Sequence, residues 1–492
     1  MNYLDLLKLA SPEAALALTA LAVLALGLAS ARGAGVCSTV AAAGILFASA
    51  AVLLLPARAT LFHGMLVVTP LTSLFKIICL TLAFFTVLLA RDSLPRHRGE
   101  FLALLLLATI GLLLLVGSEE LLMIFIGLEL TGLSLYVMAG FDKTDSRSAE
   151  AGLKYFLFGS TASAFTLFGL SLVYGMCGTT GLAAIGQKLT AAPIQPLLLV
   201  GIVMTLIGFA FKIAAAPFHL WAPDTYQGAP IPSAAFIASG SKVASFVVLG
   251  KIVLIGFGPV QGSADWHALV AGWAPVLAAL AALSIVIGNL VALAQANVRR
   301  LLAYSAVAHA GYTLLGLVAG GPGGFTATLF YTTIYAFTLV GAFGVVALVR
   351  RETGGDEFKN FAGLWSRSPL LSGCMAIFML SLAGLPPLAG FFGKFYLFSV
   401  AMRAGANHGL LWLVALALLG SFVSLYYYLA VLKAVFVDQP ETRTPDPQPF
   451  PAIRLDFLQR ISLVFLAGTV LFLGLLPGGL VTMIASSLAA RP

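Results

Sequence analysis

Four lysines and one glutamate lie inside apolar stretches of the chain, where charged residues are rare. They are Glu129, Lys154, Lys212, Lys242 and Lys394. A charged side chain at the centre of a membrane helix costs about 2.5–3.5 kcal/mol, so five of them amount to roughly 12–17 kcal/mol. That sum is comparable with the whole net stability of a typical protein. We therefore expect these side chains to pair, to contact water or to become neutral.

The residue type at these positions favours proton transfer. Burial lowers the proton affinity of a lysine and a nearby carboxylate such as Glu129 raises it, so a buried lysine can both take up and release a proton. Arginine would keep its proton, and every arginine falls in an expected loop or near a helix end. Two alternatives stay open. One is a structural ion pair between Glu129 and a lysine, and the other is snorkelling of lysines near helix ends, foremost Lys76 and Lys433 and to a lesser degree Lys154.

Two histidines are weaker candidates for the same pathway. His219 follows Pro217 and is expected to meet cytoplasmic water, and His309 has Ser305 and Tyr312 at helical spacing. A lone histidine more often has a structural role, and that alternative is kept. Three polar residues after His219 are interpreted as caps and anchors of the following loop: Asp224, Tyr226 and Gln227.

Prolines interrupt two of the helices that carry these lysines. Pro217 lacks a backbone donor and clashes with the preceding turn, so the helix is predicted to break just beyond Lys212. Pro386 and Pro387 push the residue before them out of helical geometry, and Lys394 lies about 10 Å further along. Irregular backbone inside a membrane is tolerated where it is buried in protein or lines a cavity, although ordinary proline kinks remain an alternative.

The composition requires lipid around most of the chain. Apolar residues make up 60% of the sequence and charged residues 9%, with a mean hydropathy of +1.03, whereas a soluble protein has about 25% charged residues. We predict an all-α polytopic membrane protein of about fourteen transmembrane helices, because apolar runs of about 17–25 residues recur from end to end. The spans are placed near 11–31, 35–55, 70–90, 100–117, 119–140, 149–176, 196–216, 231–255, 267–289, 298–319, 324–349, 369–402, 408–436 and 457–485.

The order of lysine and break differs between the two interrupted helices. Lys212 precedes its break and Lys394 follows its own, and five spans separate the two helices. An odd separation gives opposed directions in the membrane, which predicts two inverted five-helix repeats, each with one broken helix. The resulting division is 1–98 (helices 1–3), 99–256 (first repeat, helices 4–8), 257–437 (second, inverted repeat, helices 9–13) and 438–492 (a cytoplasmic loop and helix 14).

The distribution of charge and of cysteines indicates the topology of the chain and excludes several classes of ligand. Arginine and lysine gather in loops after odd-numbered spans, so the positive-inside rule places both termini outside the cytoplasm. The net charge of +8 is interpreted as a topology signal and not as a nucleic-acid surface. The four cysteines are scattered singly, and no glycine-rich nucleotide motif follows a strand. We therefore expect no metal, iron–sulfur cluster, flavin or NADH on this chain.

Several motifs together resemble a known family. They are 119–159 with Ile124 to Leu130, Pro217 to Asp224, Tyr226 to Pro230, Ala238 to Ala244, and Leu382 to Pro387. In combination they resemble the antiporter-like subunits of proton-pumping NADH:quinone oxidoreductase, respiratory complex I, from about the fourth to the thirteenth span. The Tyr-Gln-Gly-Ala-Pro loop is similar to that of the N branch of the family, and subunits M and L fit less well.

The resemblance implies roles for the buried residues. It implies that Glu129 pairs with Lys212, that Lys154 lies near that pair, that Lys242 passes protons across the centre and that Lys394 leads to the outer side. It also implies a module of the bacterial cytoplasmic (inner) membrane that contacts subunits M, J and K and the lateral helix of L. NADH, FMN, iron–sulfur clusters and quinone would then bind to partner subunits.

Two rival functions stay open. A subunit of a multi-subunit sodium/proton antiporter or of a membrane-bound hydrogenase would show nearly the same buried residues. A stand-alone solute transporter would need a cavity lined by varied polar groups, whereas this sequence offers mainly single-proton carriers.

Overall fold

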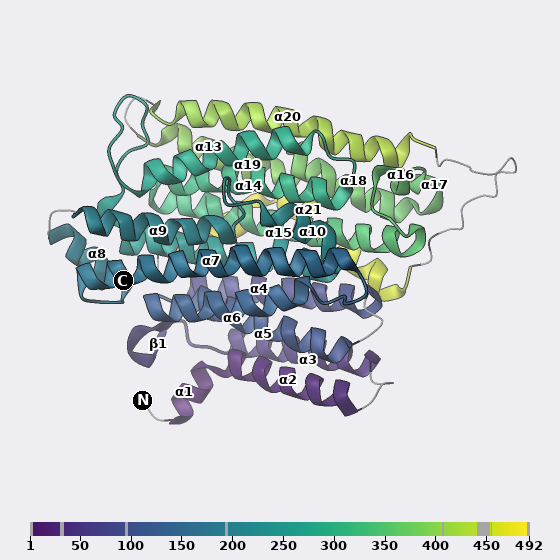
Figure 1. Cartoon of the computed structure of the whole chain (residues 1–492), viewed down its shortest axis with the longest axis horizontal. Helices are drawn as coiled ribbons and strands as arrows, with labels where there is room; N and C mark the ends of the chain where they lie inside the picture. Colours follow the sequence, from purple (N-terminus) through teal and green to yellow (C-terminus); the bar gives the residue numbers. More distant parts are fainter. Residues whose placement is uncertain are drawn as a thin grey trace, which may run out of the picture.

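The computed structural model describes residues 3–29, 34–93, 97–191, 195–405, 408–439, 453 and 455–489. The long helices run side by side, with α2 and α3 at one edge of the bundle and α20 at the opposite edge (Figure 1). The N-terminal helices are α1 (Tyr3–Leu9), α2 (Ser11–Ala29), α3 (Ala34–Leu53) and α4 (Pro70–Ser93). A short antiparallel hairpin of β1 (Ala59–Leu61) and β2 (Leu66–Val68), joined by η1 (Phe62–Gly64), connects α3 to α4.

The helices of the first predicted repeat are α5 (Arg98–Gly117), α6 (Leu121–Ala139), α7 (Ser146–Cys177), α8 (Leu182–Ala191), α9 (Pro196–Lys212), α10 (Trp221–Gly228), α11 (Ile231–Ala238) and α12 (Gly240–Lys251), followed by η2 (Ile252–Gly256) and η3 (Gly258–Val260). The second contains α13 (Trp273–Ala292), α14 (Val298–Ala319), α15 (Gly321–Thr353), α16 (Phe358–Phe361), α17 (Leu364–Arg367), α18 (Pro369–Ala383), α19 (Ala389–Arg403) and α20 (Leu411–Phe436). The chain ends with α21 (Phe457–Leu475) and α22 (Pro477–Ala489).

The all-helical membrane fold predicted from the sequence is confirmed. Among the described residues, twelve helices are long and apolar enough to cross a membrane. The two predicted spans outside that set are the interrupted ones, 196–216 and 369–402, whose helices α9, α18 and α19 are shorter. The count of fourteen and the inverted repeat remain predictions. The loop expected at the start of 438–492 lies largely outside the described residues.

Both predicted breaks occur where the prolines stand. α9 ends at Lys212, and Ala214 takes a left-handed backbone with φ of 58°. α18 ends at Ala383, and Gly384 has φ of 86°, a conformation that glycine adopts without steric cost. The helical segments α10 and α19 resume beyond the two breaks.

The structure adds two interruptions that the sequence analysis did not predict. The span 231–255 divides into α11 and α12 at Ser239, whose φ and ψ are −115° and −82°. The first predicted repeat therefore holds two broken helices and not one. The final span 457–485 divides at Leu476, because Pro477 cannot donate the next helical hydrogen bond.

The centre of the bundle is formed by α11, α12, α14 and α15, which are almost entirely buried. α15 packs against α4, α14, α18, α19 and α21, and α14 packs against α13 and α10. In contrast, α2, α7 and α21 leave most of their surface exposed. Lys242 and His309 lie on two of the central helices, α12 and α14, and are therefore far from bulk lipid.

Candidate proton pathway

The last residue of α9, Lys212, points its ammonium toward α6. Its Nζ donates to the hydroxyl of Tyr136 at 3.3 Å and lies 5.3 Å from the centre of that ring. The ammonium also lies close to Gly132 of α6, where an added Cβ would lie 2.7 Å from Nζ. A glycine at this position therefore makes the room into which the lysine extends.

Glu129 lies one turn from Gly132 on the same face of α6, because residues three apart are neighbours on a helix. Its carboxylate accepts a hydrogen bond from Ser163 of α7. Among the described residues no ion pair joins Glu129 to Lys212. The expected direct pairing is thus not made: the tyrosine hydroxyl binds the ammonium and a serine binds the carboxylate.

Lys154 is bound by carboxylates, and its expected place near Glu129 and Lys212 stays a prediction. It is partly exposed on α7 and forms ion pairs of 2.6 Å with Glu150 and Asp224. Asp224 on α10 also accepts from Arg300 of α14 at 2.7 Å. Burial alone would raise the pKa of the Asp224 carboxyl, but Lys154 and Arg300 hold it below its usual value. Asp224 therefore anchors α10 to α7 and α14, and Lys154 belongs to this anchor.

Lys242 lies in the first turn of α12, just past the break at Ser239. Its Nζ donates to the backbone carbonyl of Ala306 on α14 at 2.8 Å. The ammonium also lies 5.5 Å from the ring centre of Tyr335 on α15. The hydroxyl of Tyr335 has no hydrogen-bond partner among the described residues.

His309 follows Ala306 by one turn of α14 and both of its ring nitrogens have a partner. The Tyr331 hydroxyl lies 2.8 Å from Nδ1, and the Tyr428 hydroxyl lies 3.0 Å from Nε2. Tyr428 also contacts the hydroxyl of Ser305. A neutral histidine donates through one nitrogen and accepts through the other, so this ring can pass a proton between two hydroxyls.

Lys394 on α19 reaches back to the end of α18. Its Nζ donates to the carbonyls of Leu382 and Ala383, at 3.0 and 2.9 Å, and to the hydroxyl of Ser421 at 2.9 Å. The break at Gly384 frees these carbonyls, since the last carbonyls of a helix have no partner within it. The broken helix thus creates the binding site for the buried ammonium.

A tyrosine belt surrounds His309 and reaches Lys394; we define it as Tyr312, Tyr331, Tyr335, Tyr427 and Tyr428. The ring of Tyr312 lies 5.2 Å from Nζ of Lys394, and its hydroxyl accepts from Asn289 at 2.9 Å. Asn289 in turn accepts from Tyr427 at 3.0 Å. Sequence reasoning missed most of this belt. The available signals were the i, i+4 spacing of Tyr331 and Tyr335 and the adjacent pair Tyr427 and Tyr428 in apolar runs.

His219 is buried, with 6% of its surface exposed, and does not join this belt. Its Nδ1 has no hydrogen-bond partner among the described residues, and its ring lies 6.3 Å from that of Tyr304. His219 thus exposes little surface, and its contact with cytoplasmic water stays a prediction. Its position beside the break at Pro217 leaves a role near Lys212 as a prediction.

Comparisons with known proteins decide the family. Residues 118–422 match the family model described as NADH:quinone oxidoreductase/Mrp antiporter, transmembrane region. NADH-quinone oxidoreductase subunit N 2 of Acidobacterium capsulatum is 47% identical over 97% of this chain and 98% of its own length. The chain belongs to the NADH-quinone oxidoreductase subunit N family. Subunit N of Moorella thermoacetica is 41% identical over 94% of this chain and 95% of its own length.

Solved structures agree with membership of the subunit N family. A chain of respiratory complex I from Thermus thermophilus is 35% identical and covers 96% of this chain and 99% of its own, with a TM-score of 0.79. A chain of the Mrp complex from Dietzia, 20% identical, covers 97% of each chain with a TM-score of 0.81 and shows the fold alone. The predicted resemblance is confirmed. This chain is a multi-span membrane protein and one part of a multi-subunit enzyme complex, and every candidate residue named from the sequence lies within the matched range 118–422.

Proposed function

We propose that this subunit N conducts protons across the membrane through Lys212, Lys242, His309 and Lys394, in the membrane arm of a bacterial NADH:quinone oxidoreductase. The observation that carries the proposal is the buried polar series on α12, α14, α15 and α20. Lys242 binds the turn of α14 that leads to His309, and His309 lies between two tyrosine hydroxyls. Such a series offers protonatable or hydrogen-bonding groups across the most deeply buried part of the bundle.

Lys212 is the proposed site of proton uptake from the cytoplasm. Its ammonium is bound by the neutral hydroxyl of Tyr136, and Glu129 lies about two turns from that tyrosine on α6. A movement of α6 or α9 that changes the distance between the two charges would change the proton affinity of the lysine. Glu129 therefore tunes Lys212 through space, while Tyr136 binds the lysine and Ser163 binds the glutamate.

Lys394 is the proposed site of release to the outer side. Its ammonium is stabilised by two carbonyl dipoles and a hydroxyl. Loss of the proton breaks no ion pair there. A proton arriving from His309 through the tyrosine belt would therefore meet a lysine that can give up its own.

The energy that drives proton translocation has to come from neighbouring subunits. We propose that NADH, FMN, iron–sulfur clusters and quinone bind to partner chains and none to this one. The proposed neighbours are subunits M, J and K and the lateral helix of subunit L. With both termini outside the cytoplasm, the end of the bundle that carries Arg299 and Arg350 faces the cytoplasm.

Lysine replacement in the assembled complex tests the function. We expect Lys394→Ala and Lys212→Arg each to lower NADH-driven proton uptake into reconstituted vesicles by about tenfold or more, since a positioned proton-transfer group contributes about 10²–10⁴-fold. Arginine fails because it keeps its proton at any usable pH. The matched control is Lys433→Ala, a lysine at a helix end whose side chain is 68% exposed.

Assembly of each variant is first checked by native electrophoresis. If Lys212→Arg and Lys394→Ala assemble and pump at the parental rate, the lysines are structural and the proton route lies in another subunit.

A further inference from the structure

A cavity of about 1040 Å³ lies between the ends of α4 and α15 and the start of α21, away from the buried lysines. Its wall is apolar and comes from all three helices: Phe85, Leu88, Leu89, Leu348, Leu463 and Leu466. The volume is at the upper end of the roughly 300–1,000 Å³ typical of ligand sites. An apolar cavity of this size at a helix end fits a chain molecule better than a small polar one.

The mouth of the cavity carries charges of both signs, but the carboxylates are already engaged. Asp142 accepts from Thr144, Asp145 caps α7, and Asp456 caps α21. Glu100 pairs with His97. These carboxylates therefore stabilise the local backbone and have little remaining capacity for a bound cation.

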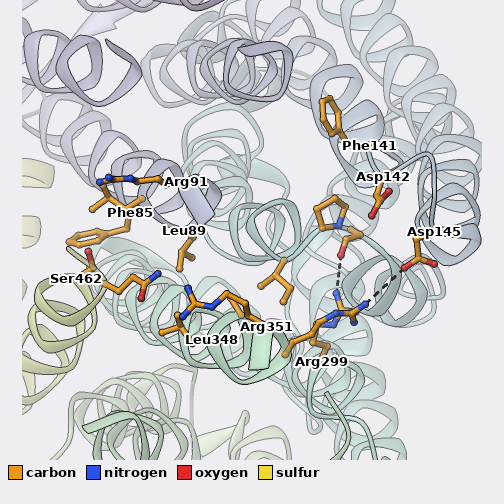
Figure 2. Close-up of a pocket in the computed structure, with 18 of the residues that line it drawn as sticks. Phe85, Leu89, Arg91, Phe141, Asp142, Asp145, Arg299, Leu348, Arg351 and Ser462 are labelled. Atoms are coloured by element: carbon orange, nitrogen blue, oxygen red, sulfur yellow. Dashed lines mark hydrogen bonds and ion pairs between the residues drawn. The ribbon is translucent and has the colours of Figure 1, made fainter. Parts of the chain in front are cut away.

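Two cations at the same mouth are less engaged. Arg91 and Lys143 have no hydrogen bond or ion pair among the described residues, and both are exposed. Arg351 pairs with its sequence neighbour Glu352 at 3.3 Å. Figure 2 shows Arg91 with Phe85, Leu89 and Ser462 on one side of the pocket, away from Asp142 and Asp145. The positive charge of Arg91, which has no partner among the described residues, thus stands beside the apolar wall.

We propose that this cavity binds one anionic glycerophospholipid. Its phosphate contacts Arg91, with Lys143 and Arg351 contributing to the positive potential, and its acyl chains lie along the apolar wall. Basic pockets between membrane helices on the cytoplasmic side select anionic headgroups in this way. Free phosphate would leave the wall in contact with water, so the apolar depth favours the lipid. The site is independent of the proposed proton pathway.

Photolabelling of the assembled complex tests this site. The complex is reconstituted into phosphatidylcholine vesicles that contain a minor fraction of phosphatidylglycerol with a diazirine on an acyl chain, and labelled peptides are identified by mass spectrometry. We expect label on the peptides of α4, α15 and α21 that line the cavity. Arg91→Gln lowers it by about fivefold, since one basic residue contributes about 1 kcal/mol near anionic lipid, and the double variant with Arg351→Gln lowers it further.

The matched control is Arg403→Gln, an exposed arginine at the end of α19, which leaves the label on these peptides unchanged. Both replaced residues at the cavity are exposed, so the fold tolerates their loss. The proposal is overturned if no label reaches the cavity, if diazirine phosphatidylcholine labels it equally, or if the double variant keeps the parental label. Removal of the label by inorganic phosphate would instead identify a free-anion site and overturn it as well.

Discussion

Five lysines of this chain divide into two groups by what binds the ammonium. Lys76 and Lys154 form ion pairs with carboxylates at 2.6 Å. Lys212, Lys242 and Lys394 are bound by hydroxyls and carbonyls, and no ion pair is made by these three among the described residues. Removing one partner of a buried ion pair leaves an uncompensated charge and costs about 3–5 kcal/mol. The second group can lose a proton without that cost, which makes it the better candidate for proton transfer.

Tyr428 is the residue at which the proton pathway can be tested most specifically. Its hydroxyl contacts both Ser305 and His309, so Tyr428→Phe removes two hydrogen bonds and almost no volume. We expect NADH-driven proton uptake to fall by about tenfold in an assembled complex, because His309 then lacks its partner on one side. Tyr426→Phe is the control, since that neighbouring tyrosine is 69% exposed. Equal pumping by the two variants would exclude Tyr428 from the pathway.

At the scale of elements, breaks in helices make the places where charge can be buried. α18 ends early and Lys394 binds its freed carbonyls, while α12 starts anew after Ser239 and places Lys242 in its first turn. α9 ends at Lys212, so the lysine side chain extends from the end of this helix toward α6. Each lysine is thus adjacent to irregular backbone, which a membrane tolerates only where protein or water surrounds it.

The close approach of Lys212 to α6 gives a test at this scale. Gly132→Ala places a methyl group 2.7 Å from Nζ, and the flexible ammonium has to move away from Tyr136. We expect proton uptake to fall severalfold while the helix itself gains up to about 1 kcal/mol from the better helix former. Gly175→Ala on α7 is the matched control, because nothing lies within 4 Å of its added Cβ. Parental pumping by Gly132→Ala in vesicles would show that the position of Lys212 is unimportant.

For the whole molecule, ion-pair networks at one end of the bundle join its two halves. Asp356, in the loop after α15, binds Arg299 of α14 and Arg350 of α15, and Arg299 also donates to Ala229 at the start of α11. Burial alone would raise the pKa of Asp356, but Arg299 and Arg350 hold it below its usual value. Asp224 makes a second link, to α7 and α14. The two predicted repeats are therefore tied together on the side where Lys212 is proposed to load.

The orientation of the molecule can be measured directly. The distribution of arginine and lysine predicts that a reporter fused after Pro492 lies outside the cytoplasm and that one inserted in the 350–368 loop lies inside. Paired alkaline phosphatase and green fluorescent protein fusions distinguish the two sides. Activity of both reporters on the same side would contradict the predicted topology and reverse the proposed direction of proton movement.

The sequence by itself determined the helical membrane fold, the family and the breaks at Pro217 and Pro386–Pro387. Hydropathy is a local property of about twenty consecutive residues, and a proline disrupts its own helix whatever surrounds it. The positions of the deep lysines were evident for the same reason. A charge in an apolar run is visible without knowing its neighbours.

Only the tertiary structure decided which group binds each charge. Lys154 pairs with Asp224, seventy residues away, and the tyrosine belt joins α14, α15 and α20, so no spacing along one helix predicts either. No proline lies at the break at Ser239, so the positions of the prolines do not predict it. Partners, distances and the room left by Gly132 depend on how helices pack, because a hydrogen bond requires both atoms within about 3 Å and neighbours in sequence do not supply them.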